Sequence, residues 1–516
     1  MFEAAEIEHN VSKEKFKEAE LELHHRVLTL QQRLRQSSKS LIIIVSGVEG
    51  AGKGEVLDRL NRWFDTRDVE THAFWDETDE ELQRPRYWRF WRCLPARGSV
   101  GIMFGSWYTK PIVDLALKRS DQATMDQELA RINALEQMLS IDGSIILKFW
   151  FHLPKEEQKR RLESEAKIKK LKKSPLLEDF SKSYDSFLSV SERAIRVSDT
   201  GHAPWHIIGA TDMKYRDLAM GSILVNTLEE ALTEDDQADN KPATLASSLP
   251  SDSDDDIVAA ILNGEASHAT VLDSVDLSQQ LDDKDYDEQL IALQEKLHGL
   301  AWEMFRLRRN MVMVFEGWDG AGKGSAIRRV TAAIDARLYR VIPIAAPSDE
   351  ELAHHYLWRF WRHIPRCGHI TIYDRSWYGR VLVERVEGFA SKQQWLRSYQ
   401  EINDFEEHLT NHGTVVCKFW VHIDQEEQLR RFKAREQDPR KQHKITDEDW
   451  RNREKWHNYE LAVNDLVTHT STANTPWTLV AGNDKKFARV QILRTICDRL
   501  QAVVGAEQYS HAVEPD

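Results

Sequence analysis

The stretch Met311-Val-Met-Val-Phe-Glu-Gly-Trp-Asp-Gly-Ala-Gly-Lys-Gly-Ser325 decides the fold of this 516-residue chain. Its first five residues form an apolar run that is typical of a buried parallel strand. Gly317 to Lys323 then match the pattern G-x-x-x-x-G-K. In that pattern the backbone N–H groups cradle phosphate at the start of a helix, and the lysine reaches the transferring group. A chance glycine-rich turn is the alternative, but the preceding strand argues against it.

The same pattern occurs once more, 270 residues earlier in the chain. Gly50-Ala-Gly-Lys-Gly54 repeats as Gly320-Ala-Gly-Lys-Gly324, and Trp88-Arg-Phe-Trp-Arg92 repeats as Trp358-Arg-Phe-Trp-Arg362. Five tryptophans recur at nearly constant spacing: Trp88/Trp358, Trp91/Trp361, Trp107/Trp377, Trp150/Trp420 and Trp205/Trp477. Rare residues that recur in this way indicate a tandem duplication. We therefore predict an N-terminal domain over 1–230, a linker over 231–275 and a C-terminal domain over 276–516.

The net charge of −14 belongs to the segment between the two copies. Residues 229–288 contain 18 acidic side chains and two lysines, a net charge of −16, so the rest of the chain sums to +2. Acidic, Ser and Pro residues without an apolar period cannot bury enough surface to fold, which predicts a solvated linker. Ile257 to Leu262 is apolar enough for a short docked helix. The total charge therefore does not argue against a polyanionic partner.

Composition excludes several classes of protein. No uninterrupted apolar run approaches the ~18 residues that a membrane span needs. The first residues, Met1-Phe-Glu-Ala-Ala-Glu, lack the basic-then-apolar order of a signal peptide. The four cysteines are scattered without a CxxC pair, so neither a disulfide scaffold nor a zinc ribbon fits. We expect a cytoplasmic protein with no membrane partner.

The second copy alternates helical and apolar segments. Tyr286 to Arg309 carries leucines at helical spacing and predicts a helix before the first strand. Further strands are predicted at Ile370 to Tyr373, Thr414 to Ile423 and Trp477 to Ala481. Short apolar strands separated by helices predict an α/β fold with a parallel sheet covered on both faces.

Two aspartates are candidate metal ligands. The Ser or Thr that usually follows the lysine of such a loop and holds Mg²⁺ is replaced by Gly324. A metal here needs other oxygen ligands, and Asp319 inside the loop and Asp374 at the end of the next predicted strand could supply them. Each aspartate alone could be a turn residue, whereas the pair around a lysine favours Mg²⁺.

Arginines follow the loop in a band interleaved with aromatic residues. The band comprises Arg359, Arg362, Arg366, Arg375, Arg380 and Arg385. Guanidinium groups match phosphate oxygens, although exposed arginines on a solvated face would give the same pattern. Arg375 and Arg380 flank Asp374 most closely, so we expect them to touch substrate. A later basic run, from Arg430 to Lys444, is either a mobile lid or an ordinary solvated helix.

With Tyr373-Asp-Arg-Ser-Trp-Tyr-Gly-Arg380 and Val381-Leu-Val-Glu-Arg385 added to the loop, the chain resembles the polyphosphate kinase type 2 family. The resemblance implies two copies of a P-loop kinase-like, three-layer α/β/α sandwich with a helical lid. It also implies Mg²⁺-dependent phosphoryl transfer from inorganic polyphosphate to a nucleotide. The tandem form is similar to members that phosphorylate AMP, so we expect the terminal phosphoryl group to reach AMP and give ADP.

The motifs and the resemblance together assign expected roles. Catalytic roles are expected for Asp319, Lys323, Asp374, Arg375 and Arg380, with Asp319 and Asp374 as metal ligands. Substrate binding is expected from Gly317, Gly320, Gly322, Gly324, Arg359, Arg362, Glu384, Arg431 and Lys444. Phosphoryl transfer depends on positioning and charge neutralisation, so these residue types suffice without a covalent nucleophile.

The first copy departs from the second at these positions. Asp374, Arg375, Arg380, Lys444 and Asp319 correspond to Phe104, Gly105, Lys110, Ser174 and Glu49. A phenyl ring cannot replace a carboxylate ligand, so we expect the N-terminal domain to be folded but inactive. Its retained Lys53 and the basic run from Lys167 to Lys173 could hold polyphosphate, although packing against the active domain is the favoured interpretation.

Three other functions stay open on the residues alone. The chain could be a polyphosphate-dependent nucleoside diphosphate kinase, an ATP-dependent kinase of a small substrate, or a non-catalytic polyanion-binding protein. The ATP-dependent enzymes usually keep Ser or Thr where this chain has Gly324. A binding protein has no need for the complete set of two aspartates, a lysine and an arginine. No nucleic-acid partner is expected, and a homo-oligomer is an open alternative.

Overall fold

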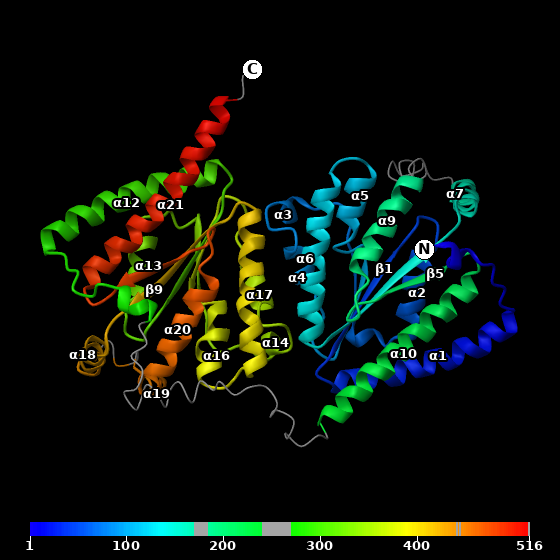
Figure 1. Ribbon diagram of the computed structural model, residues 1–516, viewed down its shortest axis with the longest axis horizontal. Coiled ribbons are helices and arrows are strands. Elements are labelled where there is room, and N and C mark those ends of the chain that lie inside the picture. The colour runs from blue at the N-terminus through cyan, green and yellow to red at the C-terminus, as the bar shows by residue number, and fades with distance from the viewer. Residues whose placement is uncertain (170–183, 240–269, 440–441, 443–444, 514–516) are drawn as a thin grey trace. The chain divides into compact units, whose positions relative to one another are not determined.

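The computed structural model describes residues 1–169, 184–239, 270–439, 442 and 445–513, which divide into two compact units (Figure 1). Each unit is built on its own five-stranded sheet. The expected helix at Ile257 to Leu262, Ser174 and Lys444 lie outside the described residues.

The first half of the chain alternates strands and helices. Its strands are β1 (Ser40–Gly47), β2 (Val69–Ala73), β3 (Val100–Phe104), β4 (Ser144–His152) and β5 (Trp205–Gly209). Its helices are α1 (Lys13–Gln36), α2 (Lys53–Trp63), α3 (Asp79–Leu82), α4 (Trp88–Trp91), α5 (Thr109–Ala116), α6 (Gln122–Ile141), α7 (Lys155–Lys169), α9 (Tyr184–Ser198) and α10 (Met213–Asp239), with 3₁₀ turns η1 (Glu3–Glu6) and η2 (Thr66–Asp68).

The second half repeats this order. Its strands are β6 (Met311–Gly317), β7 (Tyr339–Pro343), β8 (Ile370–Asp374), β9 (Val415–His422) and β10 (Trp477–Ala481). Its helices are α12 (Asp283–Arg306), α13 (Lys323–Thr331), α14 (Asp349–Leu352), α15 (Trp358–Trp361), α16 (Val383–Val386), α17 (Lys392–Asn411), α18 (Gln425–Glu436), α19 (Asp447–Glu454), α20 (Trp456–Thr470) and α21 (Lys485–Val513), with 3₁₀ turns η3 (Val271–Ser274) and η4 (Trp377–Val381).

Both sheets are parallel and have the same topology. The strand order is β2-β3-β1-β4-β5 in the first sheet and β10-β9-β6-β8-β7 in the second. In the second sheet Phe315 of β6 pairs with Asp374 of β8. The carboxyl ends of β6 and β8 therefore meet at one edge, where parallel α/β sheets place their sites.

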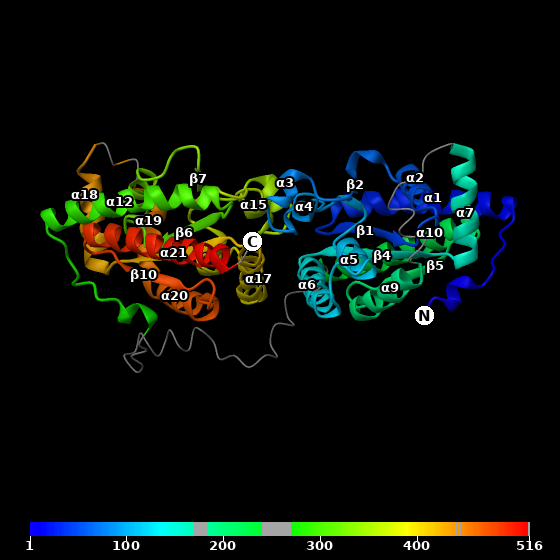
Figure 2. The same ribbon diagram turned by 90° about the horizontal axis from the view of Figure 1, so that it is seen from above.

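Helices cover both faces of the second sheet. Helix α21 packs on α12, α13, β9 and β10, while α17 packs on β9, α20 and η4. Figure 2 shows α12 and α20 on opposite sides of this sheet. Because both faces are covered, the first five residues of β6 are fully buried, which explains their unbroken apolar sequence. The predicted α/β three-layer fold is confirmed.

The repeated aromatic residues belong to the core. Lys418 Nζ lies 2.8 Å from Glu406 Oε2 and donates to Tyr378 OH at 2.9 Å, and Trp377 Nε1 donates to Glu406 Oε1 at 3.2 Å. All four side chains are buried. The first unit keeps the same network with Trp107, Tyr108, Glu136 and Lys148. Burying a charged pair is costly unless its remaining polar atoms are also bonded, and in both units these hydrogen bonds are present.

The predicted helix and strands of the second copy are present, within a few residues at each end. Strand β7, which the sequence did not reveal, is an edge strand that pairs with β8. Helix α10 continues to Asp239, beyond the expected linker start at 231, and Val271 N of η3 donates to Asn464 Oδ1.

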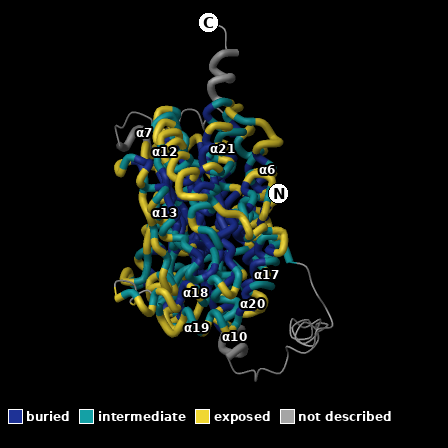
Figure 3. Tube along the Cα trace, turned by 90° about the vertical axis from the view of Figure 1, so that its left-hand side faces the viewer, coloured by how far each residue is buried: buried dark blue, intermediate teal, exposed yellow. Residues whose placement is uncertain are grey.

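Figure 3 shows buried segments along the interior and exposed residues on α18 and α19. In the described part of the chain, every helix is too short or too polar to cross a membrane.

Candidate active site

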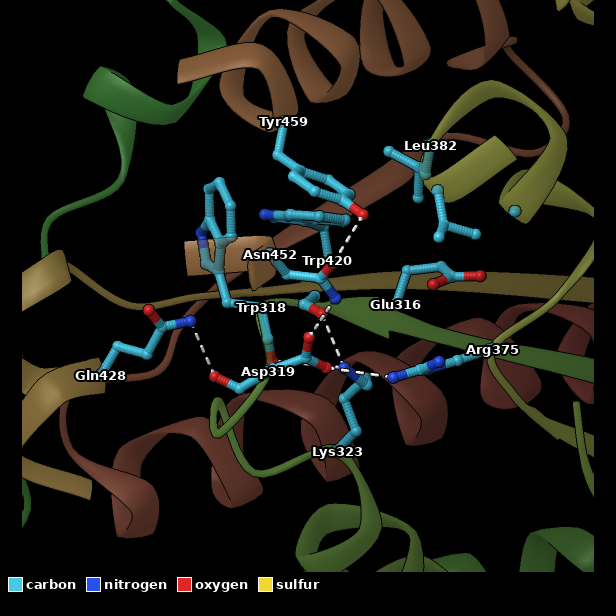
Figure 4. Close-up of a pocket in the computed structure, with 13 residues that line it drawn as sticks. Glu316, Trp318, Asp319, Lys323, Arg375, Leu382, Trp420, Gln428, Asn452 and Tyr459 are labelled. Atoms are coloured by element: carbon cyan, nitrogen blue, oxygen red, sulfur yellow. Dashed lines mark hydrogen bonds and ion pairs between the residues drawn. The ribbon is translucent and has the colours of Figure 1, made fainter. Parts of the chain in front are cut away.

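A pocket lies at the carboxyl end of the second sheet, beside the glycine-rich loop (Figure 4). Its lining comprises Glu316, Gly317, Trp318, Asp319, Lys323, Arg375, Gly379, Leu382, Val383, Trp420, Gln428, Asn452 and Tyr459. Figure 4 shows Asp319, Lys323 and Arg375 close together at one end, while Leu382 and Tyr459 lie at the other. The pocket therefore has a charged end and a largely apolar end.

The loop has the backbone that its glycines predict. Gly317 has φ +142°, and a Cβ there would collide with the carbonyl oxygen of Val421. Gly322 caps helix α13 with φ +113°, a conformation that other residues rarely adopt. The carbonyl oxygen of Gly322 accepts from the N–H groups of Ser325 and Ala326 at 2.9 and 3.1 Å, so the N–H groups of Lys323 and Gly324 are the ones that a helix start leaves without intrahelical partners. Lys323 Nζ donates to the carbonyl oxygens of Gly317 at 2.6 Å and Trp318 at 3.2 Å.

Asp319 is the centre of a polar network. Its Oδ1 accepts from Arg375 Nη2 at 3.1 Å, and its Oδ2 accepts from Asn452 Nδ2 at 3.0 Å. Tyr459 OH in turn donates to Asn452 Oδ1 at 3.2 Å. Burial alone would raise the pKa of Asp319, but the positive charges of Lys323 and Arg375 and these hydrogen bonds outweigh burial and hold the pKa below its ordinary value. Asp319 is therefore a carboxylate at neutral pH.

Asp374 lies on the other side of the loop. A Cβ added to Gly324 would lie 3.9 Å from Asp374 Oδ2, so this carboxylate is beside the first turn of α13. Among the described residues, the Asp374 carboxylate makes no hydrogen bond or ion pair, whereas both oxygens of Asp319 accept hydrogen bonds. The absence of a side chain at Gly324 leaves space beside Asp374.

The donor set fits a hard divalent cation only in part. Two carboxylates near a lysine suit such an ion, which takes oxygen ligands. Within the described ranges, however, no three His, Cys, Asp or Glu side chains gather as a ready metal site. A metal held by Asp319 and Asp374 would complete its coordination with phosphate oxygens and water.

The remaining predicted arginines lie outside the pocket lining. Arg380 Nη1 pairs with Glu384 Oε2 at 2.9 Å, and the Arg380 guanidinium lies 4.4 Å from the ring centre of Tyr356. Arg359 donates to the carbonyl oxygen of Ala345 at 3.1 Å, and Arg362 lies 4.6 Å from the ring centre of Trp358. The structure thus brings Asp319, Lys323 and Arg375 together and places these three arginines in other contacts.

Arg431 differs from the expectation of a lid residue. Its side chain is 2% exposed, and its guanidinium donates to the loop carbonyls of Gly320 and Ala321 at 3.1 and 2.7 Å. It also donates to the carbonyls of Gly482 and Asn483 at 2.6 and 2.9 Å. Arg161 makes equivalent contacts in the first unit. The Arg431 side chain is therefore buried against the loop rather than solvated. Its expected role in substrate binding stays a prediction.

Four polar lining residues were not predicted as site residues: Glu316, Gln428, Asn452 and Tyr459. Glu316 directly precedes the first loop glycine, so its position was a signal that could have been used. Gln428 Nε2 donates to the Asp319 carbonyl at 3.0 Å. Gln428 and Asn452 lie on α18 and α19, more than 100 residues after Asp319 in the sequence. No motif in the residues around them indicates that they belong to a site.

In the first unit the loop lysine pairs with an acidic residue of the same loop. Lys53 Nζ donates to the carbonyls of Gly47 and Val48 at 3.1 and 3.2 Å and to Glu49 Oε2 at 2.9 Å. The longer side chain of Glu49 thus neutralises the loop lysine, whereas Asp319 pairs with Arg375 instead. The phosphate-binding end of the first copy therefore differs in charge from that of the second.

The turn after β3 also differs from the turn after β8. Gly105 has φ +75°, and Arg375 at the equivalent position has φ +65°. A Cβ at Gly105 would collide with the carbonyl oxygen of Phe74, so this backbone has no room for an arginine. Phe104 occupies the position of Asp374.

Comparisons with known proteins agree with this architecture. The family model described as polyphosphate kinase 2 matches residues 10–236 and 280–507. A polyphosphate:AMP phosphotransferase of Pseudomonas aeruginosa is 46% identical over 97% of this chain and 99% of its own length. A polyphosphate:AMP phosphotransferase of Acinetobacter johnsonii is 36% identical over 92% of this chain and 93% of its own length.

Shorter relatives and a solved structure extend the comparison. NDP-polyphosphate phosphotransferase 3 of Ruegeria pomeroyi is 37% identical over 41% of this chain and 71% of its own length. A crystal structure described as polyphosphate kinase 2 from Pseudomonas aeruginosa superposes with a TM-score of 0.85 at 46% identity, covering 97% of this chain and 99% of that one. The family model covers well over half of the chain, in two copies. The chain therefore belongs to the polyphosphate kinase 2 family.

Proposed function

We propose that this chain transfers the terminal phosphoryl group of inorganic polyphosphate to AMP, giving ADP, and that the second unit carries the reaction. The observation that supports the location is the cluster of Asp319, Lys323 and Arg375 at the end of the second sheet. The acceptor is supported by the relatives that share both copies, which are polyphosphate:AMP phosphotransferases. The first unit, with Phe104 and Gly105 in place of the acid and the arginine, is proposed to be inactive.

The chemistry follows from the charges at the pocket. Phosphoryl transfer spreads negative charge over the transferring group, so preorganised cations and N–H donors lower the barrier. Lys323 and the start of α13 would hold the transferred phosphate, and Arg375 would neutralise charge from the side of β8. Four residues outside the central cluster are proposed to contact a long polyanionic donor or the nucleotide. They are Arg359, Arg362, Arg380 and Glu384.

A magnesium ion is proposed as the cofactor. Asp319 and Asp374 would hold it, and when bound it would neutralise negative charge on the phosphate oxygens of the substrates. The hydrogen bonds of Asp319 to Arg375 and Asn452 would be shared with the ion or exchanged for it. The second proposed ligand, Asp374, lies beside Gly324, which has no side chain.

We propose domains at 1–230 and 276–516 of a cytoplasmic protein, joined by an acidic connector at 231–275. Helix α10 extends into the connector segment as far as Asp239, and η3 lies at its other end. In the first unit Lys53 already pairs with Glu49 of the same loop. This pairing favours a packing role for that unit over the binding of polyphosphate.

The test is product analysis with the full chain. Polyphosphate and Mg²⁺ are incubated with AMP, ADP or GMP, and ATP replaces polyphosphate as donor in a parallel series. The proposal expects ADP from AMP and polyphosphate, with little product when ATP is the donor. Faster turnover of ADP than AMP would favour a nucleoside diphosphate kinase, as in the shorter relative. Polyphosphate binding without turnover of any nucleotide would make the chain a binding protein.

A further inference from the structure

Arg375 has an unusual backbone conformation for its location. Three non-glycine residues among the described ones have positive φ: Lys118, Arg308 and Arg375. Lys118 and Arg308 directly follow the caps of α5 and α12, where such a conformation commonly ends a helix. Arg375 instead follows a strand, with φ +65°, where no helix end accounts for it. Residues held in sparsely populated conformations persist only when their surroundings fix them.

Two bonds fix this turn to strand β6. Arg375 N donates to the carbonyl of Phe315 at 3.1 Å, which continues the ladder between β6 and β8. The next residue, Ser376, donates from Oγ to Glu316 Oε1 at 2.7 Å, and its Oγ accepts from Tyr378 N at 3.3 Å. Glu316 and Ser376 are 5% and 3% exposed, so the bond between them is shielded from water. Burial raises the pKa of the Glu316 carboxyl group, and the hydrogen bond from Ser376 opposes this rise.

The first unit keeps the turn but lacks this second bond. Ser106 occupies the position of Ser376, and its Oγ also accepts from the backbone N–H two residues on. Glu316, however, is replaced by Ser46, and Arg375 by Gly105. Glycine adopts positive φ without strain, so this copy of the turn needs no additional anchor. The glutamate is therefore present in the copy where a side chain must be held at positive φ, and absent from the copy where it need not be.

We infer that Glu316 is a positioning residue for the proposed phosphoryl transfer: through Ser376 it holds the turn that presents Arg375 to the pocket. The carboxylate of Glu316 lines the same pocket as the arginine. Glu316 acts through Arg375 and need not touch the substrate. This inference rests on the proposed function, because its main readout is the turnover of polyphosphate and AMP.

The test is a double-mutant cycle in the full chain. Glu316→Ala and Ser376→Ala are each expected to lower kcat about tenfold, the loss expected when one charge-assisted hydrogen bond no longer orients a catalytic group. The KM for AMP should change less than about twofold, since the bond positions charge for the reacting group. Glu316→Gln keeps an oxygen acceptor and should retain kcat within about threefold. In an Arg375→Gly background, Glu316→Ala should lower kcat by less than about twofold further, because the residue it positions is gone.

Ser106→Ala is the matched control, since it removes the equivalent hydroxyl from the first unit, and it should leave kcat unchanged. If Glu316→Ala does not fold, the same cycle with Ser376→Ala carries the test. Effects of Glu316→Ala and Arg375→Gly that multiply independently would overturn the inference. A wild-type chain that does not turn over polyphosphate and AMP would instead refute the proposed function, so the two failures are distinguishable.

Discussion

Arg375→Gly separates stability from activity, because this arginine has a strained backbone and, among the described residues, one ion pair. The substitution installs the residue that the first copy has at the same position, where Gly105 adopts φ +75°. Three effects on stability oppose one another. Relief of the positive-φ strain stabilises the fold by about 1 kcal/mol. The greater freedom of glycine in the unfolded chain costs about 0.5–1 kcal/mol.

The third effect is the loss of the ion pair with Asp319. The Arg375 side chain is 45% exposed, so the pair contributes only about 0.5–1 kcal/mol. The net change in the free energy of unfolding is therefore expected to lie within about 1 kcal/mol of zero. The effect on catalysis is expected to be much larger. Removing a guanidinium that neutralises charge in the transition state costs about 3–4 kcal/mol, equivalent to a 10²–10³-fold loss of kcat.

The assay pairs thermal denaturation with the rate of ADP formation from polyphosphate and AMP. Arg375→Lys serves as a control, since it keeps the positive charge and the strain but loses the planar fork. We expect Arg375→Gly to melt within a few degrees of the wild type while its kcat falls at least 10²-fold. A wild-type rate in Arg375→Gly would refute the catalytic role. A large drop in the melting temperature would show that the arginine stabilises the fold.

Three further predictions concern Asp374, Gly105 and the pH dependence of stability that Asp319 causes. Asp374→Asn should lower turnover about 10²-fold, as expected for a lost metal ligand, and leave polyphosphate affinity in equilibrium binding nearly unchanged; a wild-type rate would contradict the metal role. Gly105→Ala should destabilise the chain by about 2 kcal/mol in denaturant unfolding, because an added Cβ meets a backbone carbonyl at positive φ; unchanged stability would contradict this geometry. The lowered pKa of Asp319 stabilises the fold above its unfolded pKa, and this stabilisation is lost as pH falls through the folded pKa. Wild type should thus lose more unfolding free energy between about pH 5 and pH 3 than Arg375→Gly, which lacks one cause of the depression; equal losses would argue against the coupling.

Local sequence was enough to predict the features that depend on adjacent residues. The loop glycines, the buried run before them and the strand that ends at Asp374 are each encoded within a few residues. Trp377 and Trp420, which recur in both copies of the sequence, are buried. Parallel pairing of β6 and β8 then brings the loop and Asp374 to the same edge, so this part of the site followed from the fold class.

Other features depend on tertiary contacts that no local pattern reports. Asn452 reaches Asp319 from a helix 133 residues further along the chain. The guanidinium of Arg431 is satisfied by backbone carbonyls, and residue type alone cannot distinguish such a partner from solvent or substrate. Strand β7 was missed because Tyr339–Pro343 includes exposed and half-buried residues of an edge strand, which weakens the apolar signal.

A comparison of the two loop lysines in the full chain tests most directly whether the second copy alone carries the reaction. Lys53→Ala and Lys323→Ala remove equivalent side chains from the first and second copies, and ADP formation from polyphosphate, AMP and Mg²⁺ is measured for each. Lys53 already pairs with Glu49, whereas Lys323 lines the pocket with Asp319 and Arg375. We expect the wild-type rate for Lys53→Ala and at least a 10²-fold loss for Lys323→Ala. Loss of turnover in Lys53→Ala, or its retention in Lys323→Ala, would contradict the claim that the second copy alone carries the reaction.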